Sequence, residues 1–234
     1  MNKRTVYEEI AYVLGLILLG LGTAFMEIAD FGLSMIVAPA YIIHVKIAEY
    51  LPFFSFGMAG YVLQFFVLII LCIVVRKFKP MYLVSFCTAV LYGFILDGCL
   101  LLFTYMPTEG IFVRIVYYTV GVLLCAMGIA FLFKTYIAPA AYDLFVKEIA
   151  DTYNFRLDRV KTLYDCGSLL VAVILSFAFF GIGELVGIGI GTVVCTVLNG
   201  MLIGLFANLY NKFFIFKRLI SGGDKKDKQG KCLD

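Results

Sequence analysis

Five polar or acidic residues lie within or beside long apolar runs, and their types suit the binding of a proton or a small solute. An ionisable group inside a bilayer gives up its hydration, so such residues usually serve transport or ligand binding. Asp97 is the strongest candidate, because apolar residues flank it on both sides. We therefore predict that Asp97 takes up and releases protons during a working cycle. The full set is Asp97, Asp165, Gln64, Glu27 and Asn199.

A second interpretation applies to the acidic residues at the ends of apolar runs. Glu27, Asp30 and Asp165 stand where charged residues of a membrane interface are common. Asp97 is deeper, about four residues or ~6 Å from the middle of a helix over 83–103. Asp97 is therefore the residue for which an interface role explains least.

Two Ala-Pro-Ala segments could each present a helix start to a ligand. Pro39 and Pro139 lie at their centres. Proline fits the first turn of a helix, and the unpaired N–H groups of that turn attract anions. Each segment is therefore predicted to begin a short helix. The alternatives are a structural kink and an interfacial helix lying among lipid headgroups.

Glycines near the last apolar run are predicted to serve close helix packing or a flexible gate. Gly187 and Gly191 are four residues apart, as are Gly200 and Gly204, and this spacing is typical of tightly packed membrane helices. Gly189 lies between the first two. The run resembles a phosphate-binding loop only in its glycines, because no Gly-Lys-Ser/Thr ending follows.

Enzymatic and metal chemistry find little support in the sequence. His44 is the only histidine, so neither a metal site nor a Ser-His-Asp triad can be assembled around a histidine cluster. The seven cysteines form no CxxC pair, and six lie in or beside apolar runs, where cysteine acts as a small hydrophobe. We expect no enzyme and no cofactor; a membrane transferase that uses carboxylates is the alternative left open.

The composition identifies the solvent of this chain as lipid. Of its 234 residues 63% are hydrophobic and 15% charged, and the mean hydropathy is +1.00. Soluble domains have about 45–50% apolar and about 25% charged residues. The composition excludes a soluble enzyme, a disordered protein and a secreted disulfide scaffold.

Six apolar runs are long enough to span a bilayer as helices. A spanning helix needs about 20 largely apolar residues. We therefore predict an all-α membrane protein with six transmembrane helices. The runs are 10–26, 51–75, the stretch between Lys79 and Thr108, 115–133, 166–183 and 185–211.

Positive charges orient these spans. With the N-terminus inside, 17 of the 19 Lys and Arg residues lie on the inner side, and only Lys46 and Arg114 lie outside. Inner loops of membrane proteins carry such an excess. Both termini are therefore predicted to be cytoplasmic. The polar, Lys-rich segment 221–234 is expected to be a disordered tail near the anionic inner leaflet.

The two halves of the chain repeat each other. The segments 36–40 and 136–140 share Ile/Val-Ala-Pro-Ala character, and a Gly-x-Ala-Phe stretch precedes each, at 22–25 and 128–131. Cys87 and Cys195 also correspond. Three spans per half is an odd number, so the second half must enter the membrane from the opposite side, as in many transporters. The predicted units are 1–106, 107–220 and the tail 221–234.

The chain resembles the YitT/YczE-like bacterial integral membrane proteins. The resemblance is carried by Gly-Thr-Ala-Phe at 22–25 with the proline segment that follows, and by Gly-Ile-Gly-Thr at 189–192 leading to Asn199 and Gly200. It extends over nearly the whole chain and implies a multi-pass protein of the bacterial inner membrane. The family has no settled substrate, so the resemblance implies no ligand.

The sequence favours a secondary transporter or exporter of a small solute that works by alternating access. Expected partners are membrane lipid, a small solute of anionic character and protons; nucleic acid is not expected, and self-association is left open. The alternatives are a substrate-binding subunit of an ATPase-energised importer, a channel, and a structural or regulatory membrane protein.

Overall fold

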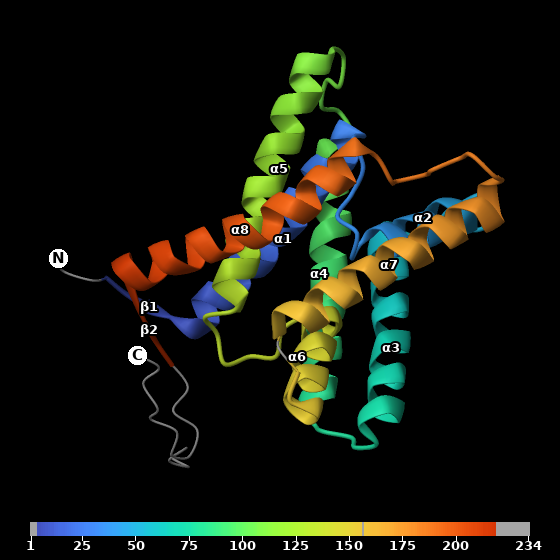
Figure 1. Cartoon of the computed structure of the whole chain (residues 1–234). Helices are drawn as coiled ribbons and strands as arrows, with labels where there is room; N and C mark the ends of the chain where they lie inside the picture. Colours follow the sequence, from blue (N-terminus) through green and yellow to red (C-terminus); the bar gives the residue numbers. More distant parts are fainter. Residues whose placement is uncertain (1–3, 156, 219–234) are drawn as a thin grey trace.

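Long helices make up most of the chain (Figure 1). The computed structural model describes residues 4–155 and 157–218, without the side chains of 4, 157, 158, 161, 162, 196, 197 and 200. The helices are α1 (Glu8–Ala29), α2 (Ala38–Ala48), α3 (Phe56–Val75), α4 (Met81–Phe103), α5 (Ile111–Leu132), α6 (Ala141–Tyr153), α7 (Leu157–Phe180) and α8 (Ile190–Phe213). Two short strands are β1 (Arg4–Tyr7) and β2 (Phe214–Lys217).

Among the described residues, five helices are long and apolar enough to cross a membrane: α1, α3, α4, α5 and the part of α7 from Leu163 to Phe180. They correspond to five of the six expected spans. The sixth, 185–211, overlaps α8, a helix of 24 residues that is outside this group of five and whose side chains are only partly described. The chain is therefore a multi-pass membrane protein by helix length and hydropathy.

The centre of the molecule is the packed pair α1 and α5. A side chain added at Gly15 would meet the Gly128 carbonyl oxygen at 3.0 Å, and one added at Gly22 would meet the Gly121 carbonyl oxygen at 2.7 Å. Glycine lets two backbones come this close, so dispersion contacts run the length of the pair. The buried residues around it form the main core, which includes Leu16, Met26 and Val122.

The short helices pack across the two halves of the chain, whereas α4 and α8 each pack on the central helix of their own half. The short helix α2 packs on α7, and the short helix α6 packs on α3 and α4. Helix α4 lies against α1, and α8 lies against α5. In Figure 1, α7 and α8 slant across the other long helices and diverge from each other, whereas α3 and α4 run side by side.

The two strands differ from the expectation of an all-α protein. β1 and β2 pair in parallel, with Arg4 opposite Phe214 and Tyr7 opposite Lys217. They join the start of α1 to the end of α8, two points that only the tertiary fold brings together. The predicted disordered tail, 221–234, lies outside the described residues.

Candidate functional site

Asp97 is a residue of α4, and its carboxylate contacts the start of α3. Its Oδ2 accepts a hydrogen bond from the Ser55 hydroxyl, and its Oδ1 accepts one from the Gly57 backbone N–H at 2.8 Å. Ser55 is the N-cap of α3, because its hydroxyl also accepts from the Met58 N–H at 3.1 Å. A carboxylate is well placed at a helix start, where N–H groups lack intrahelical partners.

The position of Asp97 along α4 is close to the one that the sequence suggests. It follows the middle of α4 by five residues, about 7.5 Å along the axis, and it is level with the first turn of α3. A side chain at Gly57 would meet the Asp97 carboxylate at 2.6 Å and would overlap the Gly93 carbonyl group. The sequence offers no sign that Ser55, Gly57 and Gly93 surround this carboxylate.

Gln64, on α3, accepts a hydrogen bond from the start of another helix, α6. Its side chain is almost fully buried, and Oε1 accepts a hydrogen bond at 3.0 Å from the N–H of Ala141, the first residue of α6. The sequence identifies Gln64 as a polar residue inside a span but gives it no partner. Here it satisfies a helix-start donor that would otherwise be buried and unpaired.

The two proline segments differ in local geometry. Pro39 is the second residue of α2, as expected for a proline in a first turn. The second segment also leads directly into a short helix, but Pro139 lies two residues before α6 begins and so is outside its first turn. The reason lies in its surroundings: the Ser85 hydroxyl donates to the Pro139 carbonyl at 2.7 Å and thereby holds the segment in an extended form.

Asp165 lies on α7 where that helix passes the start of α2. It is half-buried. Three residues further along, the Ser168 hydroxyl donates at 2.8 Å to the carbonyl oxygen of Met35, in the segment that leads into α2. Helix α7 therefore contacts the approach to α2, as α3 contacts the start of α6.

Glu27 and Asn199 occupy partly buried positions on other helices. Glu27 is near the end of α1; its charge and that of Asp30 add to burial, the larger cause, in raising the pKa of Tyr41 on α2 to about 12. Asn199 lies on α8, and its Oδ1 is buried without a hydrogen-bond partner among the described residues. Its amide oxygen is thus an acceptor that the described part of the chain leaves unused.

The glycines before α8 form a close contact between two loops. The Gly187 carbonyl accepts from the Leu33 N–H at 3.0 Å, and the Gly191 N–H donates to the Phe31 carbonyl at 2.9 Å. A side chain at Gly189 would overlap the Phe31 carbonyl. These contacts favour the packing interpretation over the gate. The surroundings of Gly200 lie outside the described residues.

Sequence reasoning missed a buried polar network beside α4. The Tyr12 hydroxyl shares a hydrogen bond with Thr88 at 2.8 Å, and Thr88 donates to the Ala138 carbonyl at 3.1 Å. Tyr92 donates to Thr23 at 2.9 Å. The network ties α1 and α4 to the segment before α6. Tyrosine and threonine are common in apolar runs, so their pattern carries no signal.

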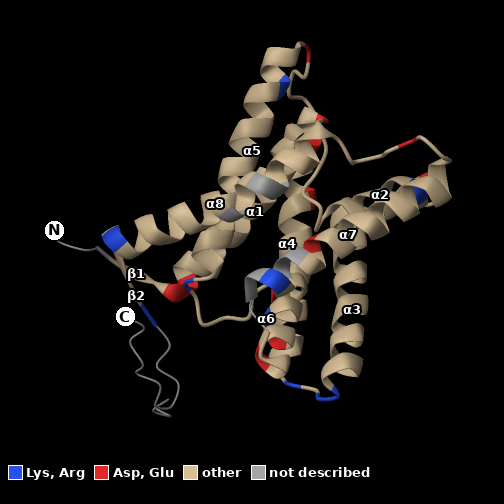
Figure 2. Ribbon diagram, viewed as in Figure 1, with Lys and Arg blue, Asp and Glu red and all other residues tan. Residues whose placement is uncertain are grey.

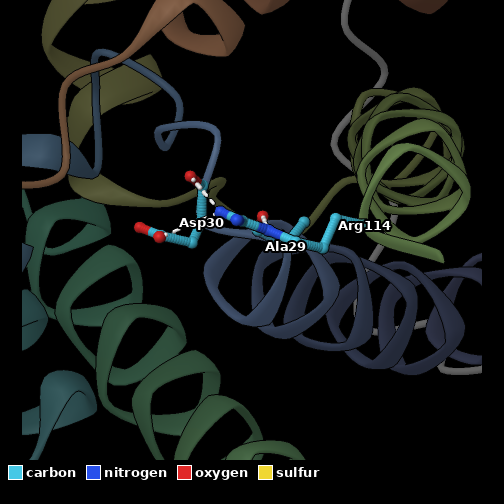
Figure 3. Close-up of polar contacts among 3 residues, drawn as sticks. All are labelled: Ala29, Asp30 and Arg114. Atoms are coloured by element: carbon cyan, nitrogen blue, oxygen red, sulfur yellow. Dashed lines mark hydrogen bonds and ion pairs between the residues drawn. The ribbon is translucent and has the colours of Figure 1, made fainter. Parts of the chain in front are cut away.

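Arg114 was also missed as a structural residue. Its guanidinium donates to the backbone carbonyl oxygens of Ala29 and Asp30, at 2.8 and 2.9 Å, and to the Asp30 carboxylate at 2.9 Å (Figure 3). The last carbonyls of a helix lack intrahelical donors. Arg114, at the start of α5, therefore caps the end of α1.

Three of the five candidates thus lie by the starts of three different helices instead of in one shared pocket, and Glu27 and Asn199 lie elsewhere on α1 and α8. Asp97 serves the start of α3 and Gln64 the start of α6, while Asp165 lies by the approach to α2. The described residues contain no group of three or more His, Cys, Asp and Glu that could hold a metal ion. The arrangement can offer hydrogen-bond donors of helix starts together with nearby carboxylates, which suits binding and proton exchange.

Comparison with known proteins identifies a family for this chain. Neither a curated protein nor a solved structure matches it. A family described as "Family of unknown function (DUF6198)" matches residues 6–208, which include every candidate residue above. That description does not name the YitT/YczE-like proteins, so the resemblance to them stays a prediction. Because the match extends over most of its length, the chain belongs to the family of unknown function DUF6198.

Proposed function

We propose that this protein is a membrane transporter of a small solute, built from two inverted halves that exchange roles in alternating access. The observation that carries the proposal is a reciprocity of contacts between the halves. Inverted repeats of this kind permit a transporter to open to either side by adopting two equivalent arrangements.

The glycine contacts between α1 and α5 are reciprocal. Positions on α1 correspond to positions on α5 with an offset of about 106, so that Gly15 corresponds to Gly121 and Gly22 to Gly128. Gly15 lies against Gly128, and Gly22 lies against Gly121. Exchanging the halves turns one contact into the other. A pseudo-two-fold axis between the helices accounts for both contacts at once.

The contacts at the ends of α1 and α5 are reciprocal as well. Arg114, at the start of α5, contacts Asp30 after the end of α1. With the same offset these residues correspond to Glu8 and Tyr136, and the Tyr136 N–H donates to the Glu8 carboxylate at 2.9 Å. The positions correspond, but the direction of the hydrogen bond differs. The Arg114 side chain donates to the backbone carbonyl of Asp30, whereas the Glu8 side chain accepts from the backbone N–H of Tyr136.

Contacts between whole helices also correspond between the two halves. Helix α1 packs on α4 as α5 packs on α8, and α2 packs on α7 as α6 packs on α3. The α3–α4 and α4–α6 contacts are the exceptions, since among the described residues α7 and α8 do not pack along each other and α8 does not pack on α2 (Figure 1). Both exceptions are contacts of α4 that its counterpart α8 lacks, and such an asymmetry is what a single state of an alternating cycle would have.

The distribution of charge supports a topology with both termini in the cytoplasm. Figure 2 marks the loop between α3 and α4 as basic; it carries Arg76, Lys77 and Lys79. By the positive-inside rule this loop faces the cytoplasm, and the start of α5 faces outside. The proposed location is the bacterial inner membrane. Reporter fusions after Lys79 and near Thr108 should then read cytoplasmic and external, respectively.

The solute is proposed to be small and anionic, with protons as the coupling ion. The starts of α2 and α6 offer helix-dipole positive ends, and Asp97 is the carboxylate for proton exchange. This part rests on the chemistry of the groups. A substrate-binding subunit of an ATPase complex, a channel or a structural protein would make the same use of helix starts but would not exchange halves.

A thiol experiment tests the exchange. Cys87 on α4 is exposed, whereas its counterpart Cys195 on α8 is buried with 1% of its surface accessible. Single-cysteine variants that keep only one of the two would be labelled with a membrane-permeant maleimide in proteoliposomes. The solutes would come from a thermal-shift screen of metabolites against the purified protein.

The expected result is that a stabilising solute changes the two labelling rates in opposite directions. A pH gradient should then drive uptake of that solute into the proteoliposomes. Rates that move together, or stay constant with every stabilising solute, would contradict alternating access. Conductance steps in a planar bilayer would point to a channel instead.

A further inference from the structure

An apolar groove of about 350 Å³ lies on the surface of the molecule between α3 and α4. Helix α3 contributes Phe65, Ile69 and Ile73, and the loop and α4 contribute Phe78, Leu83 and Phe86. The volume is in the range of small-molecule sites, which begin at about 300 Å³. None of the five candidate residues lines the groove.

The groove exists because α3 and α4 are close at one end and held apart at the other. Near Asp97 the backbones of Gly57 and Gly93 are in contact. Towards the basic loop, bulky rings separate the helices, and the centroids of Phe65 and Phe86 lie 5.7 Å apart. Helix α6 fills one side of this opening through Leu144. The other side is left open.

The open walls are strongly exposed. Ile73 is 69%, Phe78 64% and Leu83 59% exposed. From Phe65 to Ile73 the groove runs about 12 Å along α3. One leaflet of a bilayer has a hydrocarbon thickness of about 15 Å, half of the whole core. The groove therefore has the length of a lipid chain in one leaflet.

Positive charge stands at the mouth of the groove. Arg76, Lys77 and Lys79 lie in the loop that closes it, and all are exposed. Lys79 is neutralised by an ion pair with Glu148 of α6 at 2.5 Å. Arg76 and Lys77 form no hydrogen bond or ion pair within the described part of the chain. The side chains of Arg76 and Lys77 are thus two unpaired cations at one end of the apolar groove.

We propose that this groove is a binding site for an anionic phospholipid, with one acyl chain along α3 and the phosphate on Arg76 and Lys77. Apolar walls alone would accept any lipid, whereas the two cations favour a negatively charged headgroup. The site depends only on the α3–α4 loop lying at a membrane surface, so it does not rest on the proposed transport.

The absence of tryptophan from the chain permits a direct test. A Phe78→Trp variant places a single fluorophore at the mouth of the groove. It would be reconstituted in nanodiscs of phosphatidylcholine that contain brominated phosphatidylglycerol as the minor lipid, and then in nanodiscs with brominated phosphatidylcholine at the same fraction. We expect several-fold stronger quenching by the brominated anionic lipid.

Two controls make the result decisive. Phe133→Trp, an exposed aromatic position at the end of α5, reports ordinary surrounding lipid and should show a much smaller preference. Adding Arg76→Gln and Lys77→Gln to Phe78→Trp should abolish the preference without abolishing quenching. A preference that survives both substitutions, or one equal at Phe133→Trp, would overturn the proposal. Loss of quenching by both lipids, with dimers on cross-linking, would assign the groove to a second copy of the chain.

Discussion

The α3–α4 pair and the α7–α8 pair follow corresponding proline segments in the sequence, yet they differ in how the chain buries them. In the apolar part of α3, 28% of the residues are buried inside the protein, against 11% for α7. Side-chain hydrogen bonds join α3 to both α4 and α6, through Asp97 and Gln64. The described contacts of α8 are mainly with α5.

The difference shows which features hold membrane helices together. Lipid competes equally for apolar side chains, so apolar character alone does not drive two helices together. In the first pair the backbones of Gly57 and Gly93 are in contact and a carboxylate of α4 lies on the start of α3. Among the described residues, α7 and α8 have no such contact with each other, and the close contact of Gly191 on α8 is with Phe31. Both pairs contain long apolar segments, and the first pair is distinguished by a close glycine contact and by polar partners between its helices.

The largest effect is expected from closing the space between α3 and α4. Gly57→Leu would drive a side chain into the Gly93 backbone and the Asp97 carboxylate, and we expect a loss of about 3 kcal/mol or more. The matched change Gly167→Leu on α7 meets nothing within 4 Å and should alter stability by less than about 0.5 kcal/mol. Unfolding in mixed micelles measures both. Equal losses would mean that the two pairs are equally packed.

The next largest loss of stability is expected from replacing Gln64, the buried amide side chain of α3. Gln64→Leu leaves the Ala141 N–H without its acceptor, which should cost about 1–3 kcal/mol. Gln64→Glu keeps an acceptor oxygen at the start of α6 and should retain more of the stability. The same unfolding assay compares the two variants. A leucine variant as stable as the wild type would remove Gln64 from the contacts that set the first half apart.

A smaller effect on stability is expected for Asp97→Asn. Asparagine keeps one acceptor for the Ser55 and Gly57 donors, so the loss should be about 1 kcal/mol. If Asp97 also exchanges protons, this folded variant should lose pH-gradient-driven uptake in proteoliposomes while it still binds the solute. Uptake that responds to the gradient as in the wild type would leave Asp97 as a residue of helix packing alone.

The smallest effect concerns two corresponding tyrosines. Tyr12 bonds to Thr88 of α4, and Tyr118 donates to the Gly191 carbonyl at the start of α8. Each replacement by phenylalanine should cost about 0.5 kcal/mol, the lower end of the range for a hydrogen bond. Because α4 has other partners, Tyr12→Phe should leave its hydrogen exchange unchanged, whereas Tyr118→Phe should speed exchange in the first turns of α8. Equal changes in the two helices would contradict the comparison.

The sequence alone predicts the spanning helices well. The expected runs 10–26 and 115–133 correspond to Glu8–Ala29 and Ile111–Leu132, with ends that differ by a few residues. The reason is that a segment in lipid must satisfy its backbone hydrogen bonds internally, so an apolar run of sufficient length forms a helix whatever its neighbours are. Polar residues such as Asp97 and Gln64 likewise stand out within these runs by residue type alone.

Only the tertiary structure decided what those polar residues touch. Asp97 and Gln64 both contact N–H groups that lie more than 35 residues away in the chain. Pro139 stays outside α6 because Ser85, on another helix, holds its carbonyl oxygen. The β1–β2 pair joins the two ends of the described chain. Such contacts depend on which helices lie side by side, and that choice is made by close glycines and single hydrogen bonds, which an apolar pattern does not encode.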